Sequence, residues 1–420
     1  MPEGRRRIAV IGGGGAGLTA AYVLQRRADV TLFEGDDRLG GHAQTHEIAD
    51  PRCGTVGIDS GFSVHNERTY PTLLRLFREL GVATQESDMS MSIRCGGCGL
   101  QYAGGRGVSG LVPSRRSANP RYAWMLTQVV RFHRQARRLL TTDGPEPTLK
   151  EFLTVGRFSR YFRSHFIAPL VSTVWSCTPT KSGDYPARFL FRFLANHGAL
   201  SVTGSPTWYT VVGGSARYVE KLAKGLTAIA TATPVRALVR TAGGVEIWDD
   251  TGVATPFDSA VVATHPNQAL DLLAAPTTAE SRILGAIGYT SNPAVLHTDG
   301  SVLPQGRRVQ ASWNYRLPTC AAEPTAVHVS YNVNRLQRLT TDRQYVVTLN
   351  GGADIDERDV LARMVYEHPV YDSGSVAARG RLPQLNDGRV AFAGAYHGWG
   401  FHEDACRSGV AAAASLGVTW

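Results

Sequence analysis

The hydrophobic pattern of the N-terminal residues predicts a strand, a turn, a helix and a second strand. Residues 8–11 form a short apolar run with no polar face, which is typical of a buried parallel strand. A glycine-rich turn follows, residues 18–26 predict a helix, and the apolar residues 30–33 predict the next strand. The chain therefore opens with one compact α/β unit, and the remaining sequence is organised around it.

The glycines of the turn have a specific spacing. Gly12, Gly14 and Gly17 match G-x-G-x-x-G between the first strand and the helix. The first glycine permits the tight turn, the second lets backbone approach a pyrophosphate, and the third lets the helix pack closely on the strand. The helix N-terminus, where Ala16 lies, offers amides and a dipole that hold phosphate charge. This arrangement predicts a bound dinucleotide.

The acid at the end of the second strand indicates which dinucleotide binds. Glu34 follows the apolar residues 30–33 directly, and Gly35 comes next. A carboxylate at this place accepts the hydrogens of an adenosine ribose and repels a 2′-phosphate. The sequence therefore favours an adenine dinucleotide without that phosphate.

A second glycine pair lies just past this acid, in a run that contains Arg38, Gly40, Gly41 and His42. The run resembles the second phosphate-contacting stretch of the flavin amine oxidase and phytoene desaturase superfamily, whose members bind FAD rather than NAD. This resemblance implies an α/β fold, in which a Rossmann-like FAD-binding domain of the amine-oxidase type is interleaved with an α+β substrate domain. It also implies non-covalent FAD, since no cysteine precedes the C-terminal strand at the usual attachment point.

A longer stretch makes the resemblance more specific. Residues 57–91 look like one group of predicted NAD/FAD-binding oxidoreductases, which is often encoded beside cyclopropane-fatty-acid synthases and is fused to them in plants. The resemblance implies that the turn around Gly61 and Phe62 lies near the flavin, and it makes His65 a candidate there. It also implies that Val235 clasps the adenine through its backbone.

The C-terminal residues carry the second strong signal of the same superfamily. Residues 390–394 predict a strand, and residues 405–416 predict an unbroken helix. In the superfamily this strand and this helix N-terminus hold the ribityl chain, the pyrophosphate and the N1–C2 edge of the flavin. The resemblance therefore implies cofactor contacts from Gly394, His402, Glu403 and Asp404. Where amine oxidases often have a glutamate after the glycine, this chain has Ala395.

Changes of sequence character along the chain predict two interleaved domains. The FAD-binding domain is expected to be discontinuous, and the substrate domain is expected to be inserted between its parts. The predicted FAD-binding segments are 1–105, 208–289 and 366–420, and the predicted substrate-binding segments are 106–207 and 290–365.

The first substrate segment is predicted to be mainly helical. Thr148 and Glu151 form a capping-box pattern that opens one of its helices. Residues 122–140 predict a long amphipathic helix with interleaved arginines. We expect this helix to pack on the core with its arginines exposed; peripheral contact with a membrane surface is the alternative.

Composition and charge change this picture little. With 420 residues, of which 43% are hydrophobic and 19% charged, the chain is long enough for two globular domains with a large core. Arginine carries almost all of the net charge of +9, and no basic tail or aromatic-basic motif indicates nucleic-acid binding. No apolar stretch reaches the length of a membrane span, and we expect a cytoplasmic protein.

The six cysteines give one local pattern. Cys95 and Cys98 flank two glycines, a spacing found in metal knuckles, but no second Cys or His pair follows at a suitable distance. The two glycines are also typical of a hairpin turn. We therefore expect a hairpin here and no metal site.

The predicted chemistry depends on FAD, with the protein supplying cavity, orientation and charge. Amine oxidases of the superfamily usually place a lysine against the flavin, and this chain has no lysine after Lys224. An apolar cavity is indicated instead by bulky aromatic residues of the predicted substrate domain and its borders. These residues are Phe189, Phe191, Phe193, Trp208, Trp313 and Trp399.

We therefore expect an oxidoreductase that desaturates, reduces or isomerises C–C or C=C bonds of a hydrophobic small molecule or carrier-bound acyl, fatty or polyene chain. Two alternatives stay open: oxidation of an amine or an amino-acid-derived intermediate, and a non-catalytic flavoprotein that partners a lipid-modifying methyltransferase. The candidates for proton transfer are His402, Glu403, Tyr396 and His65.

Overall fold

The central sheet of the predicted FAD-binding half is parallel, as the opening α/β unit predicts, and it has five strands. In this computed structural model, which describes residues 5–113, 119–201, 204–320 and 328–420, the strand order is β10-β2-β1-β14-β20. Every neighbouring pair in this sheet is parallel. The strands are β1 (Arg6–Ile11), β2 (Ala28–Phe33), β10 (Ala228–Ala230), β14 (Ser259–Val262) and β20 (Val390–Phe392). The predicted α/β class is confirmed.

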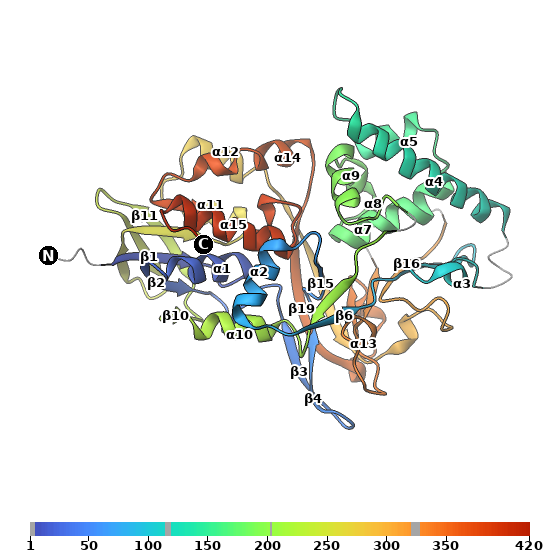
Figure 1. The fold of residues 1–420 in the computed structure, drawn as a ribbon, viewed down its shortest axis with the longest axis horizontal. Helices are drawn as coiled ribbons and strands as arrows, with labels where there is room; N and C mark the ends of the chain where they lie inside the picture. The colour runs from blue at the N-terminus through green and yellow to red at the C-terminus, as the bar shows by residue number, and fades with distance from the viewer. Residues whose placement is uncertain (1–4, 114–118, 202–203, 321–327) are drawn as a thin grey trace.

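Two helices from opposite ends of the chain pack together on this sheet (Figure 1). Helix α1 (Gly15–Leu24) follows β1, and α15 (His402–Ser415) follows β20. A Cβ atom at Gly409 would overlap the carbonyl oxygen of Ala16, so this glycine permits the close approach of the two helices. Their contact brings the predicted N-terminal and C-terminal cofactor segments side by side.

A small antiparallel sheet and several helices complete this half around a second core. The sheet order is β11-β12-β13, with strands β11 (Val235–Arg240), β12 (Val245–Asp249) and β13 (Ala254–Phe257). The helices are α2 (Pro71–Leu80), α10 (Ala216–Lys224), α11 (Pro266–Leu272), α12 (Thr278–Leu284) and α14 (Ser373–Arg379).

The other half is built on a seven-stranded mixed sheet of order β19-β15-β18-β17-β16-β7-β8. All pairs are antiparallel except β16 with β7. Strands β7 and β8 come from the predicted segment 1–105 and nevertheless join this sheet. Its strands are β7 (Met91–Cys95), β8 (Gln101–Gly104), β15 (Tyr289–His297), β16 (Trp313–Leu317), β17 (Val329–Asn332), β18 (Val346–Leu349) and β19 (Val360–Pro369).

A helical lobe lies against this sheet (Figure 1), and its core is rich in aromatic side chains. The capping box of Thr148 and Glu151 is present at the start of α5. The elements of the lobe are α3 (Gly107–Leu111), α4 (Pro120–Thr141), α5 (Leu149–Val155), α6 (Arg160–Phe162), the π-helical η2 (Arg163–Ile167), α7 (Ala168–Trp175), α8 (Pro179–Gly183) and α9 (Ala187–Asn196).

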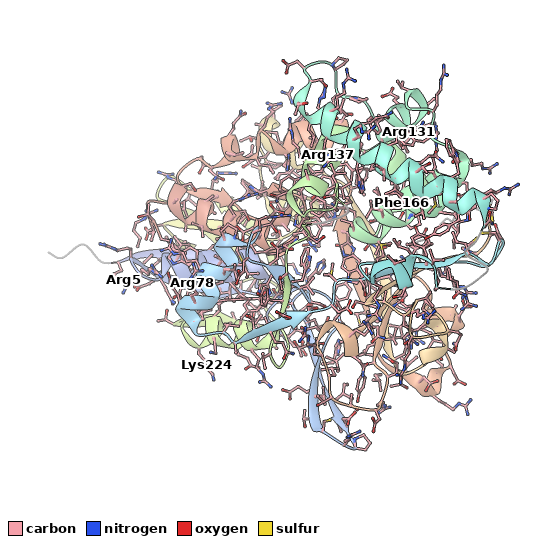
Figure 2. All side chains as sticks on the ribbon, turned by 45° about the vertical axis from the view of Figure 1, so that its right-hand side comes forward. Arg5, Arg78, Arg131, Arg137, Phe166 and Lys224 are labelled. Carbon is pink, nitrogen blue, oxygen red and sulfur yellow. The ribbon has the colours of Figure 1, made fainter. Side chains whose placement is uncertain are left out.

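Helix α4 packs as its amphipathic pattern predicts. Met125 and Phe132 are fully buried in the lobe. The guanidinium of Arg131 lies 4.4 Å from the ring centroid of Phe158, whereas Arg137 is exposed. Both arginines extend from the outer helix of the lobe in Figure 2. No helix in the described part of the chain combines the length and the apolar character that crossing a membrane requires.

Short strands and turns connect the two halves. They include the hairpin of β3 (Thr45–Asp50) and β4 (Gly54–Asp59) and a three-stranded sheet of order β5-β9-β6. The remaining elements are β5 (His65–Asn66), β6 (Thr84–Ser87), β9 (Trp208–Val211), α13 (Val333–Leu336), η3 (Gly300–Val302), η4 (Gly352–Asp354), η5 (Glu357–Asp359), η6 (Leu382–Leu385) and η7 (Ala395–His397).

Candidate active site

The three glycines of the turn have different surroundings. Gly12 has φ +103°, and its hypothetical Cβ would lie 2.9 Å from the Ala263 carbonyl oxygen. A Cβ at Gly17 would overlap the Gly12 carbonyl oxygen, so α1 packs on β1 only with glycine there. A Cβ at Gly14 meets no atom of the described residues within 4 Å. The surface above Gly14 is therefore open, whereas the other two glycines are enclosed by protein.

The second glycine pair packs directly on this turn. The Gly40 amide donates to the Gly13 carbonyl at 2.8 Å, and the Arg38 guanidinium donates to the Gly41 carbonyl at 2.9 Å. Gly40 and Gly41 both have positive φ, a backbone conformation that favours glycine. The two predicted phosphate-contacting stretches therefore form one continuous backbone surface.

The acid at the end of β2 lies beside the same turn. Glu34 accepts hydrogen bonds from the Gly13 amide at 2.6 Å and from the Asp36 amide at 2.9 Å. Gly35 lies close to Pro234, the residue that precedes β11, so Val235 at the start of that strand is nearby. The acid, the turn and the start of β11 thus surround one region, as an adenosine site requires.

The N-terminus of α1 suits a phosphate group. Its N-cap is Gly14, no side chain of the described residues caps it, and no acidic residue lies in its first turn. Uncapped amides and the positive end of the helix dipole attract an anion. Together with the open surface at Gly14, these features fit the pyrophosphate of a dinucleotide.

The loop between β20 and α15 is held by a buried carboxylate. Asp404 accepts hydrogen bonds from the amides of Trp399 at 2.9 Å and Phe401 at 3.2 Å. Arg407 contacts its other oxygen at 2.7 Å, and burial raises the pKa of Asp404. Gly394, at the start of this loop, donates its amide to Ser408 at 2.8 Å. Asp404 therefore shapes the loop that faces the cofactor region.

Glu403 ties α15 to α2. Its carboxylate accepts hydrogen bonds from the amides of Thr72 and Leu73 at 3.0 Å, at the N-terminus of α2. The N-cap of α2, Tyr70, supplies no side-chain bond. Glu403 therefore caps a neighbouring helix, and its oxygens are engaged with backbone amides.

We expect Glu403→Ala to lower the free energy of unfolding by about 1–3 kcal/mol, because two amides lose their acceptor. Glu403→Gln keeps one acceptor oxygen and should retain most of the stability and of the turnover rate. Urea unfolding of the flavoprotein measures the first effect. A large loss of turnover in a stable Glu403→Gln variant would contradict the capping role and support proton transfer.

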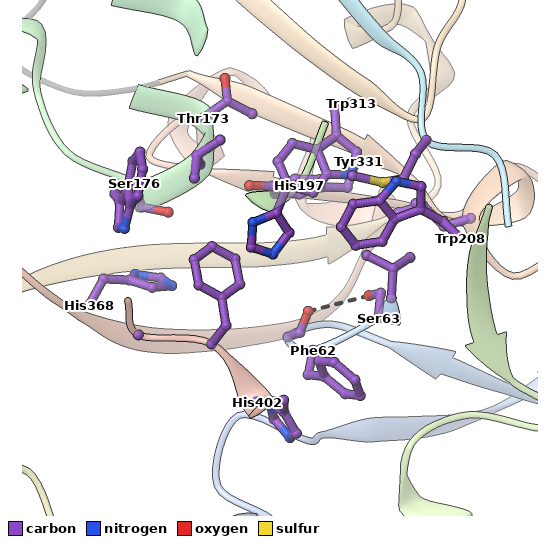
Figure 3. Close-up of a pocket in the computed structure, with 18 of the residues that line it drawn as sticks. Phe62, Ser63, Thr173, Ser176, His197, Trp208, Trp313, Tyr331, His368 and His402 are labelled. Atoms are coloured by element: carbon purple, nitrogen blue, oxygen red, sulfur yellow. Dashed lines mark hydrogen bonds between the residues drawn. The ribbon is translucent and has the colours of Figure 1, made fainter. Parts of the chain in front are cut away.

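His402 lines a cavity of the structure. Its ring stacks on Phe62 with centroids 3.7 Å apart, and Nε2 lies 2.7 Å from the Tyr218 hydroxyl. Burial lowers the pKa of His402 to about 3, so the ring is neutral near pH 7. Figure 3 shows Phe62 and His402 together on one side of the cavity.

The cavity has a volume of about 360 Å³ and lies between the two halves. One wall comes from the seven-stranded sheet, a second from α7 and α9, and a third from residues 59–64 and 399–402. Most lining side chains are aromatic or aliphatic. The aromatic ones are Phe62, Tyr70, Trp175, Phe193, Trp208, Trp313, Tyr331, Tyr366, Trp399 and Phe401.

One side of the cavity carries a polar group of residues. His42 and His368 line it, with ring centroids 5.5 Å apart, and burial lowers the pKa of both. The Tyr366 hydroxyl lies 2.6 Å from the Ser60 hydroxyl and donates to Gln44 at 2.9 Å. These groups are neutral hydrogen-bonding groups inside an otherwise apolar wall.

The similarity of this chain to known proteins agrees with this geometry. A family model described as flavin-containing amine oxidoreductase matches residues 16–328. The chain belongs to this family. FAD is therefore its cofactor, and the predicted oxidoreductase class is confirmed.

A curated relative and two solved structures show how far the similarity extends. Flavin-containing monoamine oxidase AofH of Mycobacterium tuberculosis is 28% identical over 260 residues, which cover 59% of this chain and 54% of that relative, so the chain spans about half the relative's length. Cyclohexylamine oxidase from Brevibacterium oxydans IH-35A superimposes with TM-score 0.72 at 16% identity, covering 98% of this chain and 99% of that one. A fatty acid isomerase from P. acnes that produces CLA superimposes with TM-score 0.65 at 15% identity, covering 96% and 97%. Both structures share the fold of this flavin-containing family.

The predicted residues divide into two groups in this family member. The cofactor candidates lie at the glycine turn and the second glycine pair, at Gly61 and Phe62 in the cavity lining, at the start of β11, and at Gly394 and the first turn of α15. Of the proton-transfer candidates, His402 lines the cavity, whereas Glu403, Tyr396 and His65 are absent from its lining. Tyr396 lies in the core of the FAD-binding half, and its hydroxyl has no partner among the described residues. His65 is fully buried against Tyr70, Phe77 and Tyr209, and neither of its ring nitrogens has a hydrogen-bond partner among the described residues.

Two cavity histidines were absent from the sequence prediction, which also named His42 only as a cofactor contact. His197 follows the C-terminus of α9, and His368 lies near the end of β19. Neither belongs to a motif of fixed spacing, so motif spacing gives no signal for them. Of the predicted aromatic set, Phe193, Trp208, Trp313 and Trp399 line the cavity, while Phe189 and Phe191 belong to the core of the helical lobe.

Proposed function

We propose that this protein uses FAD to desaturate, reduce or isomerise a C–C or C=C bond in a hydrophobic acyl chain. The observation that carries the proposal is the cavity beside Phe62 and His402, whose walls are mostly aromatic and aliphatic. Such walls favour a long apolar substrate, since burial of apolar surface stabilises binding by about 25 cal/mol per Å². The fold that this chain shares with a fatty acid isomerase from P. acnes is compatible with it.

The scarcity of charged side chains in the cavity lining indicates which head group the substrate carries. Among the described residues that line it, none is Lys, Arg or Glu, and the one carboxyl is Asp59. Asp59 accepts hydrogen bonds from Thr45 at 2.6 Å and from the Ser215 amide at 2.8 Å, so its oxygens are already engaged. A free carboxylate buried here would have no cationic partner, which is costly. We therefore favour an esterified or carrier-bound acyl chain, whose head group is neutral or stays at the mouth.

The residues of the chain have separate roles in this proposal. The glycine turn and the loop before α15 hold FAD, which supplies hydride transfer when bound. The aromatic walls exclude water and align the acyl chain. His42, His368 and the hydroxyls of Tyr366 and Ser60 are the neutral groups that can hold a proton or orient a carbonyl at the wall.

Amine oxidation is the second candidate, and the aromatic walls favour it too. Rings of Trp and Tyr attract an ammonium through cation–π contacts, and the curated relative AofH carries the name of a monoamine oxidase. The resemblance to proteins associated with cyclopropane-fatty-acid synthases supports a third candidate, a non-catalytic partner of a lipid-modifying methyltransferase.

One anaerobic experiment separates these candidates. The purified flavoprotein is mixed with phospholipid-bound acyl chains, acyl thioesters or amines such as cyclohexylamine and putrescine, with and without NADPH. We expect acyl chains with altered double bonds by mass spectrometry, with bleaching of the flavin spectrum if the reaction is a net oxidation. Bleaching by amines alone, with peroxide on readmission of air, would establish amine oxidation. An unchanged flavin and unchanged acyl chains with every compound would contradict catalysis on either class.

A cavity variant tests the apolar wall. Trp313→Ala should raise KM for the acyl substrate about tenfold or more while the flavin content stays constant, because about 1–3 kcal/mol of apolar contact is lost. Trp248→Ala is the matched control, since Trp248 is 37% exposed on β12 and does not line the cavity. Steady-state kinetics measure the effect. Equal KM values in the two variants would contradict a substrate site at Trp313.

A further inference from the structure

A second group of chemically reactive side chains lies outside the cavity. Cys95 and Cys98 come from the β7–β8 hairpin, His165 from the π-helical η2, and Cys320 from the segment after β16. One ligand atom from each of the four lies within 4.8 Å of all the others. We propose that these residues bind one Zn²⁺ ion in a structural Cys3His site.

The distances suit a shared metal ion. The sulfurs of Cys95 and Cys320 are 3.6 Å apart, and Cys98 Sγ lies 3.6 Å from His165 Nε2. Tetrahedral zinc, with Zn–S near 2.3 Å and Zn–N near 2.0 Å, places neighbouring ligand atoms about 3.5–3.8 Å apart. A disulfide would need sulfurs about 2.0 Å apart. The spacing therefore matches coordination of one ion.

The two glycines of the hairpin allow the fourth ligand to approach. The Gly96 amide donates to the Leu317 carbonyl at 2.9 Å. A Cβ at Gly97 would lie 2.8 Å from the Cys320 amide nitrogen, and one at Gly96 would lie 2.6 Å from the Pro318 carbonyl oxygen. Larger residues at either position would push the Cys320 segment away. The two glycines between Cys95 and Cys98 therefore form the hairpin turn and also let Cys320 come close to the other three ligands.

His165 is oriented as a metal ligand needs to be. Its Nδ1 lies 3.1 Å from the Tyr161 carbonyl oxygen and 2.8 Å from the Ser164 hydroxyl. A hydrogen on Nδ1 that is donated to the carbonyl leaves a lone pair on Nε2, which points to Cys98. Such a partner for the second ring nitrogen is typical of metal-bound histidines. A π-helical turn, often found at functional sites, carries the residue.

The expectation of no metal site rested on local spacing, which finds no second pair near Cys98. In the structure the missing ligands are His165 and Cys320, which follow Cys98 by 67 and 222 positions in the chain. Three thiolates and one imidazole prefer zinc over magnesium or calcium, and four protein ligands close the site. A closed site has no position for substrate, so its role is structural.

The location indicates what the ion would stabilise. Residues 160–175 form one continuous helical run, which carries His165 and then the cavity residues Leu170, Thr173 and Trp175. The other ligands belong to strands β7 and β16 of the seven-stranded sheet, or adjoin them. Zinc would therefore link the helical run 160–175, which lines the cavity, to the seven-stranded sheet. This structural role does not depend on which substrate the protein binds.

The test starts from the full-length flavoprotein, purified with reductant and without chelator. We expect close to one zinc per chain by elemental analysis, and X-ray absorption with about three Zn–S contacts near 2.3 Å and one Zn–N contact. Cys98→Ser and Cys320→Ser should each lower the zinc content to near zero and lower the unfolding temperature. Cys53→Ser is the control, since Cys53 is exposed and lies outside the cluster. This variant should keep the zinc content and the unfolding temperature of the unaltered protein.

Measurements on the unaltered protein test for the zinc site even where a variant does not fold. Replacement of zinc by Co²⁺ should give the visible bands of a tetrahedral thiolate site, at wavelengths beyond the flavin absorption. Absence of stoichiometric zinc, a Cys95–Cys320 disulfide found by mass spectrometry under reductant, or an iron–sulfur spectrum would each overturn it. Unchanged zinc in both Cys98→Ser and Cys320→Ser would do so as well.

Discussion

Gly14→Val should give a folded protein without FAD. A Cβ at Gly14 meets no atom within 4 Å in the described part of the chain, and the φ of Gly14, −74°, suits any residue. The side chain would instead occupy the open surface above the N-terminus of α1, where the pyrophosphate must approach the backbone. We expect the flavin content after purification to fall at least tenfold, with near-native circular dichroism.

Gly17→Ala is the informative comparison for this variant. Its methyl group would overlap the Gly12 carbonyl oxygen, so α1 cannot keep its place on β1. This variant should lose both stability and FAD, whereas Gly14→Val loses FAD alone. Flavin absorbance and urea unfolding of the two proteins measure the difference. Full flavin in Gly14→Val would contradict the cofactor assignment of the turn.

The stability of the flavoprotein should fall steeply as the pH is lowered from 6.5 towards 4. Burial lowers the pKa of His65, His197 and His368 to about 4, and that of His402 to about 3. The usual value of 6.5 applies to the unfolded chain, so between these pH values the unfolded state binds protons that the folded state does not. Stability is therefore complete above pH 6.5 and is lost as the pH falls.

The expected loss of stability on acidification is large because several histidines contribute to it. Each histidine lowers the free energy of unfolding by up to about 1.4 kcal/mol per pH unit, in the range between its pKa in the folded state and its pKa in the unfolded state. Asp59 acts in the opposite direction, since burial raises its pKa to about 6 and its protonation on acidification favours the folded state. Asp404 acts in the same direction as Asp59, because burial raises its pKa too. Two carboxyls offset only part of the effect of four imidazoles, so we expect a net loss of several kcal/mol between pH 7 and pH 5.

Urea unfolding at fixed ionic strength from pH 7.5 to pH 5 measures this dependence. His368→Gln should flatten the curve, because the glutamine amide does not titrate at this position. His328→Gln is a milder control, since His328 is only partly buried. Stability that stays constant or rises on acidification would contradict the neutral state of the buried histidines.

Local sequence determined the segments whose structure depends on near neighbours. The apolar runs became β1 and β2, the glycine spacing became the turn before α1, and Thr148 with Glu151 became a capping box. Each depends on side-chain periodicity, backbone freedom or hydrogen bonds within a few residues. The family and its cofactor followed from the same segments, because a phosphate-binding turn is itself a local structure.

Only the tertiary structure decided which polar residues meet. Glu403 became the cap of α2, Tyr396 entered a core, and His197 and His368 reached the cavity wall. The zinc ligands and the pairing of β7 with β16 likewise join residues far apart in the chain. Such contacts depend on how whole sheets and helices pack, and no spacing along the sequence encodes them. The sequence alone predicted the cofactor-contacting segments, and packing of the two halves decided which side chains line the cavity.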